Sequence, residues 1–127
     1  MGLMIQLILL LSAVGLIAID QLTKWLAQTY LMGQEPFVLI KGIFELSYID
    51  NPGAAFGLFG GKRILLIVVT SVALAALFIV LVTGKLGRSK LVLISGTLIL
   101  SGGIGNLIDR IFRHQVIDFF YFKAINF

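Results

Sequence analysis

The sequence predicts an α-helical membrane protein with three transmembrane helices and a small β-hairpin or sheet between the first two. Of its 127 residues, 59% are hydrophobic and 13% are charged, whereas a soluble domain carries about 25% charged residues. Its uncharged apolar runs are also long enough to cross about 30 Å of hydrocarbon. A chain of this length forms one domain, so we expect residues 1–127 to make a single membrane-embedded unit.

The first apolar segment begins at Gly2 and continues past Asp20 to Leu26. A cleaved signal peptide has a basic start and an apolar stretch of about 7–15 residues. This segment is longer and has no basic residue before Lys24, so it predicts a retained transmembrane helix.

Residues 31–61 are too polar to span a membrane and predict a β-hairpin. An apolar run over 37–40 is followed by Lys41-Gly42 and then by a second run over 43–49. Apolar and polar residues alternate in the second run with the period of a strand that has one greasy face. Asn51-Pro52-Gly53 is typical of a turn. We expect the hairpin to lie on the outer surface of the membrane.

Residues 64–84 and 91–108 are uncharged and predict the second and third transmembrane helices. The third is rich in small residues, which let helices approach closely in lipid, so we expect it to be packed on several sides. These residues are Ser95, Gly96, Ser101, Gly102, Gly103 and Gly105.

The link over residues 85–90 sets the orientation, because it holds three basic residues and no acid. The positive-inside rule places it, and therefore the N-terminus, in the cytoplasm. The polar residues near the ends of the spans then collect at the outer face: Asp20, Lys24, Asp50, Asn51, Asn106, Asp109, Arg110 and Asp118.

Ionisable residues at the edge of hydrocarbon are costly, so they point to a functional site. Asp118 is notable because it lies between Ile117 and Phe119 rather than in a polar loop. Two carboxylates about 3 Å apart in a poorly solvated site share a proton, so that one activates a water while the other protonates the scissile carbonyl. This is the chemistry of aspartic peptidases. The alternative is an ordinary helix end whose polar residues meet water.

The neighbouring polar residues allow two interpretations each. Arg110 either snorkels to the membrane interface or helps to hold the site. It belongs to a stripe with Asn106, Asp109 and Arg113, if the helix continues that far. Asp20 and Lys24, one turn apart, predict an ion pair that braces the site rather than acting in the chemistry.

Other kinds of site find little support. The chain has one histidine and no cysteine, which argues against a zinc site or a cysteine nucleophile. No glycine-rich loop leads to a Lys-Ser/Thr pair, so no nucleotide site is expected. The net charge of +4 comes from scattered basic residues that flank apolar spans, which suits a membrane surface better than nucleic acid.

Four segments, in order, resemble the signature boxes of the lipoprotein signal peptidases (signal peptidase II). They are DQLTK at 20–24, NPGAAFG at 51–57, GGIGNLIDR at 102–110 and VIDF at 116–119. Each box alone is modest, but four in this order are specific, and the resemblance extends over essentially the whole chain.

The resemblance implies an aspartic peptidase of the bacterial inner membrane that needs no cofactor. Its substrates would be prolipoproteins, cut just before a cysteine that carries diacylglycerol, and its other partner would be the bilayer. Asp118 would be one catalytic aspartate. Asn106, Asp109 and Arg110 would shape the site from the third helix, Asp20 and Lys24 would brace it from the first, and Asn51 and Gly53 would support it from the sheet.

The chain departs from the family pattern at its C-terminus. Family members continue with an Asn-x-Ala-Asp box, which supplies the second catalytic aspartate, and a fourth transmembrane helix. Neither follows residues 124–127, so we expect an incomplete peptidase domain with little or no activity by itself, unless Asp109 replaces the partner. The alternative is a non-catalytic membrane protein, either an inactive lipoprotein-binding paralogue or a small transporter subunit. Acids at one end of the spans count against transport, which places them near mid-membrane.

Overall fold

The computed structural model describes residues 2–51, 62–114 and 116–122. Three helices are long and apolar enough to cross a membrane, and a small antiparallel sheet accompanies them, which confirms the predicted fold class. In chain order the elements are α1 (Leu3–Tyr30), β1 (Phe37–Ile40), β2 (Phe44–Asn51), α2 (Arg63–Val82), α3 (Lys90–Ile108), the π-helical turn η2 (Asp109–Arg113) and β3 (Val116–Phe122).

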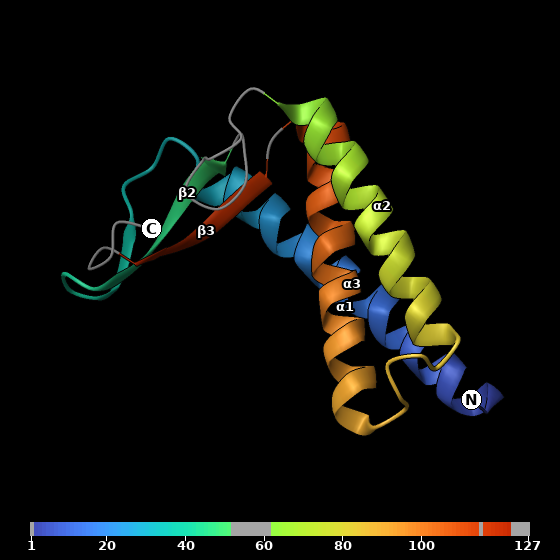
Figure 1. Ribbon diagram of the computed structural model, residues 1–127. Coiled ribbons are helices and arrows are strands. Elements are labelled where there is room, and N and C mark those ends of the chain that lie inside the picture. Colours follow the sequence, from blue (N-terminus) through green and yellow to red (C-terminus); the bar gives the residue numbers. More distant parts are fainter. Residues whose placement is uncertain (1, 52–61, 115, 123–127) are drawn as a thin grey trace.

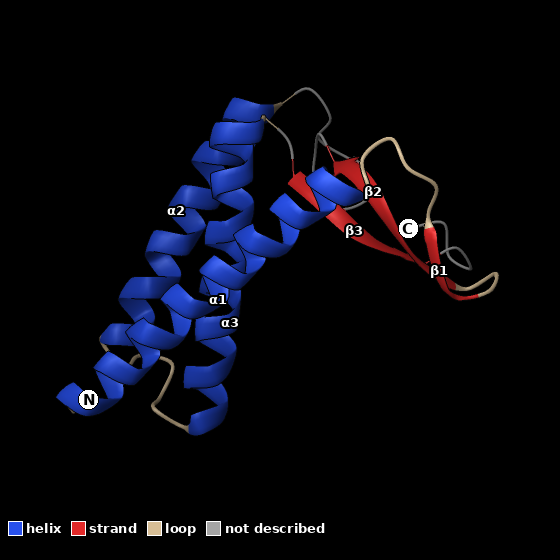
Figure 2. Cartoon of the chain, turned by 180° about the vertical axis from the view of Figure 1, so that it is seen from behind, coloured by secondary structure: helices blue, strands red, loops and turns tan. Residues whose placement is uncertain are grey.

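The helices pack around α3, which contacts both α1 and α2. In Figures 1 and 2, α2 and α3 run alongside each other, and α1 crosses them at an angle. The sheet extends to one side, near the end of α1 that is farther from the N-terminus. The N-terminus and the link between α2 and α3 lie at the opposite end of the molecule.

Small residues in α3 allow this close packing, as their abundance predicts. A Cβ added at Gly96 would lie 2.6 Å from Leu81 Cδ1, and one at Gly103 would lie 2.6 Å from Leu74 Cδ2. Real Cβ atoms do not approach other carbons so closely. A side chain at either position would therefore require the facing leucine of α2 to move, so glycine allows α2 and α3 to lie this close.

The sheet has three strands in the order β1-β2-β3, all antiparallel. The predicted hairpin is present, and its second strand runs on to Asn51, two residues beyond the expected end. The third strand, β3, was not predicted. Its sequence VIDFFYF shows no alternation of polar and apolar residues, so it becomes recognisable as a strand only when it pairs with β2.

The pairing of β2 with β3 is interrupted by a β-bulge close to Asp118. Leu46 pairs with Phe120, but the next pair is Ile49 with Asp118, so Ser47 and Tyr48 lie opposite Phe119 alone. Asn51 then pairs with Val116. Bulges shift the register of a strand and are frequent beside functional sites.

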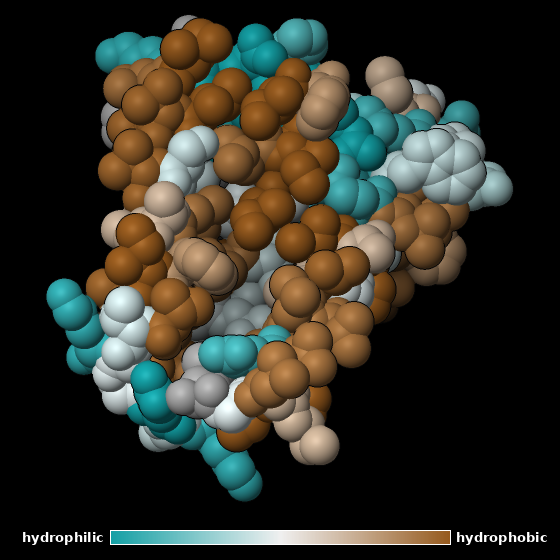
Figure 3. Space-filling model, turned by 90° about the vertical axis from the view of Figure 1, so that its right-hand side faces the viewer, coloured by the Kyte–Doolittle hydropathy of each residue, from teal (hydrophilic) through white to brown (hydrophobic). Residues whose placement is uncertain are grey.

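The outer surface is mostly apolar. Figure 3 shows hydrophobic side chains covering much of the helices, with hydrophilic residues gathered toward the two ends. All four residues of β1 are exposed as well. Among the residues whose burial the structure describes, few side chains are fully buried, and Ile117, only 1% exposed, is one of them. Such a surface suits a lipid environment. The start of β3, by contrast, is one of the most buried parts of the fold.

Candidate active site

Asp109 lies at the centre of a buried polar cluster between α1, η2 and β3, with 0% of its surface exposed. Its Oδ1 accepts from Arg113 Nη1 at 2.7 Å and from Gln21 Nε2 at 3.1 Å. Its Oδ2 contacts Lys24 Nζ at 2.7 Å and accepts from the backbone N–H of Ile117 at 3.2 Å. A carboxylate offers about four acceptor positions, and these contacts fill them.

The filled acceptor positions of Asp109 test whether it could replace the second catalytic aspartate. A proton shared with another carboxylate would need a free acceptor position on Asp109, and the side chain instead balances two cations. A role for Asp109 as the second catalytic aspartate therefore does not fit this geometry. Asp109 fixes the start of β3 through the N–H of Ile117, the residue that precedes Asp118.

Lys24 joins α1 to α3. Its Nζ lies 3.0 Å from Asp20 Oδ2, 2.7 Å from Asp109 Oδ2 and 3.1 Å from Asn106 Oδ1. An ammonium group has three donors, and each has an acceptor here. The predicted pair of Asp20 and Lys24 is present, but the same lysine also reaches the third helix, which its spacing in α1 does not reveal.

Sequence reasoning missed the glutamines of this cluster. Arg113 Nη1 donates to Gln21 Oε1 at 2.7 Å, and Arg113 Nε donates to Gln28 Oε1 at 3.1 Å. A signal was available, because Gln21, Lys24 and Gln28 lie at i, i+3 and i+7, which is a polar stripe on an apolar helix. This stripe contacts the predicted stripe of Asn106, Asp109 and Arg113, so two polar faces meet inside the fold.

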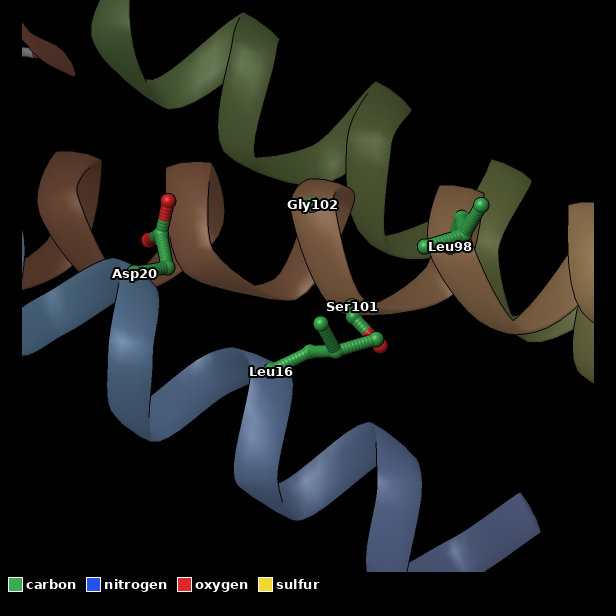
Figure 4. Close-up of a pocket in the computed structure, with 5 residues that line it drawn as sticks. All are labelled: Leu16, Asp20, Leu98, Ser101 and Gly102. Atoms are coloured by element: carbon green, nitrogen blue, oxygen red, sulfur yellow. The ribbon is translucent and has the colours of Figure 1, made fainter.

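Asp20 packs directly against the backbone of α3. A Cβ added at Gly105 would lie 2.2 Å from Asp20 Oδ2. Gln21 Nε2 also donates to the carbonyl of Gly105 at 3.1 Å. Just beside this contact, α1 and α3 border a groove of about 180 Å³ lined by Leu16, Asp20, Leu98, Ser101 and Gly102 (Figure 4). The hydroxyl of Ser101 donates to Thr97 O at 2.7 Å within its own helix.

We expect Gly105→Ala to destabilise the protein by about 1–3 kcal/mol, because the added methyl group must push Asp20 away and overpack the interface of α1 and α3. Gly102→Ala is the matched control, since a Cβ there would have no neighbour within 4 Å. Thermal unfolding of both variants in detergent tests the difference. Equal stabilities would show that α1 does not approach α3 at Gly105.

Arg110 is buried, with 9% of its surface exposed, so a snorkelling side chain with its head group in water does not fit. The helix does continue past Ile108, but as the π-helical turn η2. The turn ends at His114, whose φ of 69° is left-handed. The strand β3 begins two residues later, at Val116.

The structure describes the backbone of Asp118 and Asn51. Asp118 of β3 pairs with Ile49 of β2, and Asn51 of β2 pairs with Val116 of β3. Asn51, from the second signature box, and Asp118 therefore lie on adjacent strands of one sheet. The backbone N–H of Ile117, the residue before Asp118, donates to Asp109 in the buried cluster. Gly53 lies outside the described residues. The arrangement therefore holds the start of β3, and with it the backbone of Asp118, against α1 and η2.

Comparisons with known proteins agree with these features. The family described as Signal peptidase (SPase) II matches residues 12–127. The lipoprotein signal peptidase of Chlorobium phaeobacteroides is 48% identical over 112 residues, which are 87% of this chain and 70% of that protein. The lipoprotein signal peptidase of Clostridium acetobutylicum is 40% identical over 112 residues, which are 88% and 71% of the two chains.

A solved structure shares the fold. A bacterial membrane enzyme determined by the in meso method at 2.3 Å resolution superposes with a TM-score of 0.80 and 26% identity. The superposition covers 94% of this chain and 72% of that one. The match therefore includes the sheet and the helices together. From its sequence and its fold alike, this chain belongs to the signal peptidase II family.

Proposed function

We propose that this protein is a lipoprotein signal peptidase, an aspartic endopeptidase that removes the signal peptide from diacylglyceryl-modified prolipoproteins. Asp118 is one of its two catalytic aspartates. The observation that carries the proposal is the buried ion-paired cluster that ties the residue before Asp118 to α1 and η2. Packing and hydrogen bonds from surrounding residues are what hold a functional group in its productive geometry.

Cleavage needs two carboxylates that share one proton. The ionised carboxylate takes a proton from a water, whose oxygen attacks the carbonyl carbon of the scissile peptide bond. The protonated carboxyl gives its proton to the carbonyl oxygen, and the tetrahedral intermediate then collapses with protonation of the leaving nitrogen. Asp118 supplies one of these groups. By family resemblance, the aspartate of the Asn-x-Ala-Asp box supplies the other.

The site lies at the outer face of the bacterial inner membrane. The polar cluster involves the C-terminal part of α1 and the end of α3, whereas the basic link over 85–90 is at the opposite end of the helices (Figure 1). With that link and the N-terminus in the cytoplasm, Asp118 faces outward. A substrate anchored by diacylglycerol presents its cleavage point at this interface. Buried charges at one end of the helices also favour a peptidase over a transporter subunit.

Two reconstituted proteins test the proposal. One is the 127-residue chain, and the other, here called the extended form, also carries the C-terminal segment of the Clostridium acetobutylicum relative, in which the family resemblance implies an Asn-x-Ala-Asp box and a further transmembrane helix. We expect the extended form to shorten a diacylglyceryl-modified prolipoprotein, detected as a mobility shift on a gel, and to leave the unmodified precursor intact. The chain alone is expected not to cleave, because it lacks the second aspartate box.

Failure of the extended form to cleave would reject the peptidase proposal and favour an inactive paralogue. Cleavage of both precursors at equal rates would reject the dependence on the lipid. Clear activity of the 127-residue chain would show that the requirement for a second aspartate box is wrong.

A further inference from the structure

We infer that Arg63, which lies in none of the four signature boxes, is a positioning residue that holds η2 and thereby the strand that carries Asp118. Its effect on cleavage rests on the proposed function, but its effect on the geometry of the sheet does not. Three observations carry the inference: the contacts of Arg63, the charge at its helix end and the place of η2 in the chain.

The guanidinium of Arg63 binds two successive backbone carbonyls of η2. Its Nε donates to Arg110 O, and its Nη2 donates to Ile111 O at 2.8 Å. Arg63 is the first residue of α2, so these bonds connect the start of α2 to the end of the third span. The two helix ends are neighbours in Figure 1. The planar fork of arginine suits two adjacent acceptors, whereas lysine offers a single charged point.

The electrostatics of α2 itself do not explain an arginine at this position. A helix N-terminus carries partial positive charge, so cations there are unfavourable. Lys62 precedes the helix, Arg63 begins it, and the side chain of Lys62, the N-cap residue, makes no capping hydrogen bond. The end of the neighbouring helix, by contrast, presents carbonyl oxygens with partial negative charge. The charge of Arg63 is therefore compensated by η2 and not by its own helix.

The turn η2 is held from two sides. Asp109, at its start, is bound by Lys24 and Gln21 of α1, and Arg63 of α2 binds the carbonyls of the next two residues. From Ile111 the chain passes His114 and enters β3 at Val116. A shift of η2 would thus carry β3 with it. The bonds from Arg63 of α2 restrain that shift in addition to the bonds from α1.

Distance measurement between spin labels tests the positioning directly. The chain has no cysteine, so Leu39→Cys on the sheet and Val72→Cys on α2, both at exposed residues, give two unique labelling sites. We expect Arg63→Gln to broaden or shift the distance distribution in the reconstituted 127-residue chain, and Arg63→Lys to have a smaller effect. Lys62→Gln is the matched control, because it removes the same charge from an exposed neighbour.

Unchanged distances in Arg63→Gln, or equal changes in Arg63→Gln and Lys62→Gln, would overturn the inference. Circular dichroism of each variant verifies that the helices are retained. If Arg63→Gln does not fold, the Arg63→Lys variant tests the inference instead, because it keeps the positive charge but loses the planar guanidinium that donates to both carbonyls. A distribution for Arg63→Lys identical to that of the unsubstituted protein would then contradict the positioning role.

The extended form adds a catalytic readout. Misplacement of a reacting group by about 1 Å lowers rates by up to about a hundredfold, so we expect Arg63→Gln to lower kcat by about tenfold or more with little change in KM. A rise in KM at constant kcat would contradict positioning of Asp118 and indicate substrate binding instead. If the unsubstituted extended form does not cleave, the proposed function fails, while the label distances still decide the role of Arg63.

Discussion

Replacing Asp118 with asparagine in the extended form is expected to abolish cleavage of a diacylglyceryl-modified prolipoprotein. The amide can neither take a proton from water nor share one with the second aspartate, so turnover falls by about 10²–10⁴-fold or to nothing. Asparagine has nearly the size of aspartate, and Ile117 still donates its N–H to Asp109. The protein should therefore remain folded and inserted. The measurement is the initial rate of signal-peptide release from the modified precursor.

Glu45→Gln provides the control for this experiment. It removes another carboxylate from the same sheet, at a position that pairs with Tyr121, three residues beyond Asp118 in β3. We expect cleavage by Glu45→Gln to match that of the unsubstituted form. Full turnover by Asp118→Asn would remove Asp118 from the mechanism. Equal loss in both variants would point to the sheet as a whole and not to one carboxylate.

Replacing Asp109 with leucine is expected to lower the free energy of unfolding by about 3–5 kcal/mol, more than any other substitution proposed here. The substitution removes the carboxylate that Lys24 and Arg113 share; Lys24 keeps Asp20, but one positive charge of the buried cluster is left unbalanced, which is costly. It also leaves the N–H of Ile117 without its acceptor. Reversible unfolding in mixed micelles measures the free energy.

A double-mutant cycle separates the ion pair from general packing. Lys24→Met removes one of the two cations, so Asp109→Leu combined with Lys24→Met should cost less than the sum of the single variants. Asp20→Asn should cost less than Asp109→Leu, because the Asp20 side chain is 30% exposed and Lys24 keeps two other acceptors. Additive costs for Asp109 and Lys24 would show that the two do not interact across the helices.

The spans and their boundaries follow from the sequence because a bilayer imposes a local rule. Each backbone polar group in hydrocarbon must be satisfied within its own helix, so an uncharged run of sufficient length is enough to identify a span. The predicted helices differ from α2 and α3 by only a few residues at their ends. The hairpin was likewise readable, because alternation and turn residues act over a few positions. The family was indicated separately, by the resemblance of four short segments to its signature boxes.

The polar site followed from the sequence only in part. Hydropathy indicated that polar residues gather at one end of the spans, and the Asp20–Lys24 pair followed from helical spacing. Their partners did not, since Lys24 and Asp109 are far apart in the chain and meet only because α1 packs on α3. Gln21 and Gln28 share a stripe of α1 with Lys24, but neither glutamine carries a charge that would indicate a buried partner.

Composition and local periodicity alone determined that this protein spans a membrane, that a hairpin separates its first two helices and that its acids lie at one end. The tertiary structure alone decided that β3 joins the sheet, that Asp109 is saturated by cations and an N–H, and that Arg63 holds the end of the third span. The physical reason is the range of the interactions. Burial in lipid acts on each segment separately, whereas strand pairing and charge compensation depend on partners that folding brings together from distant parts of the chain.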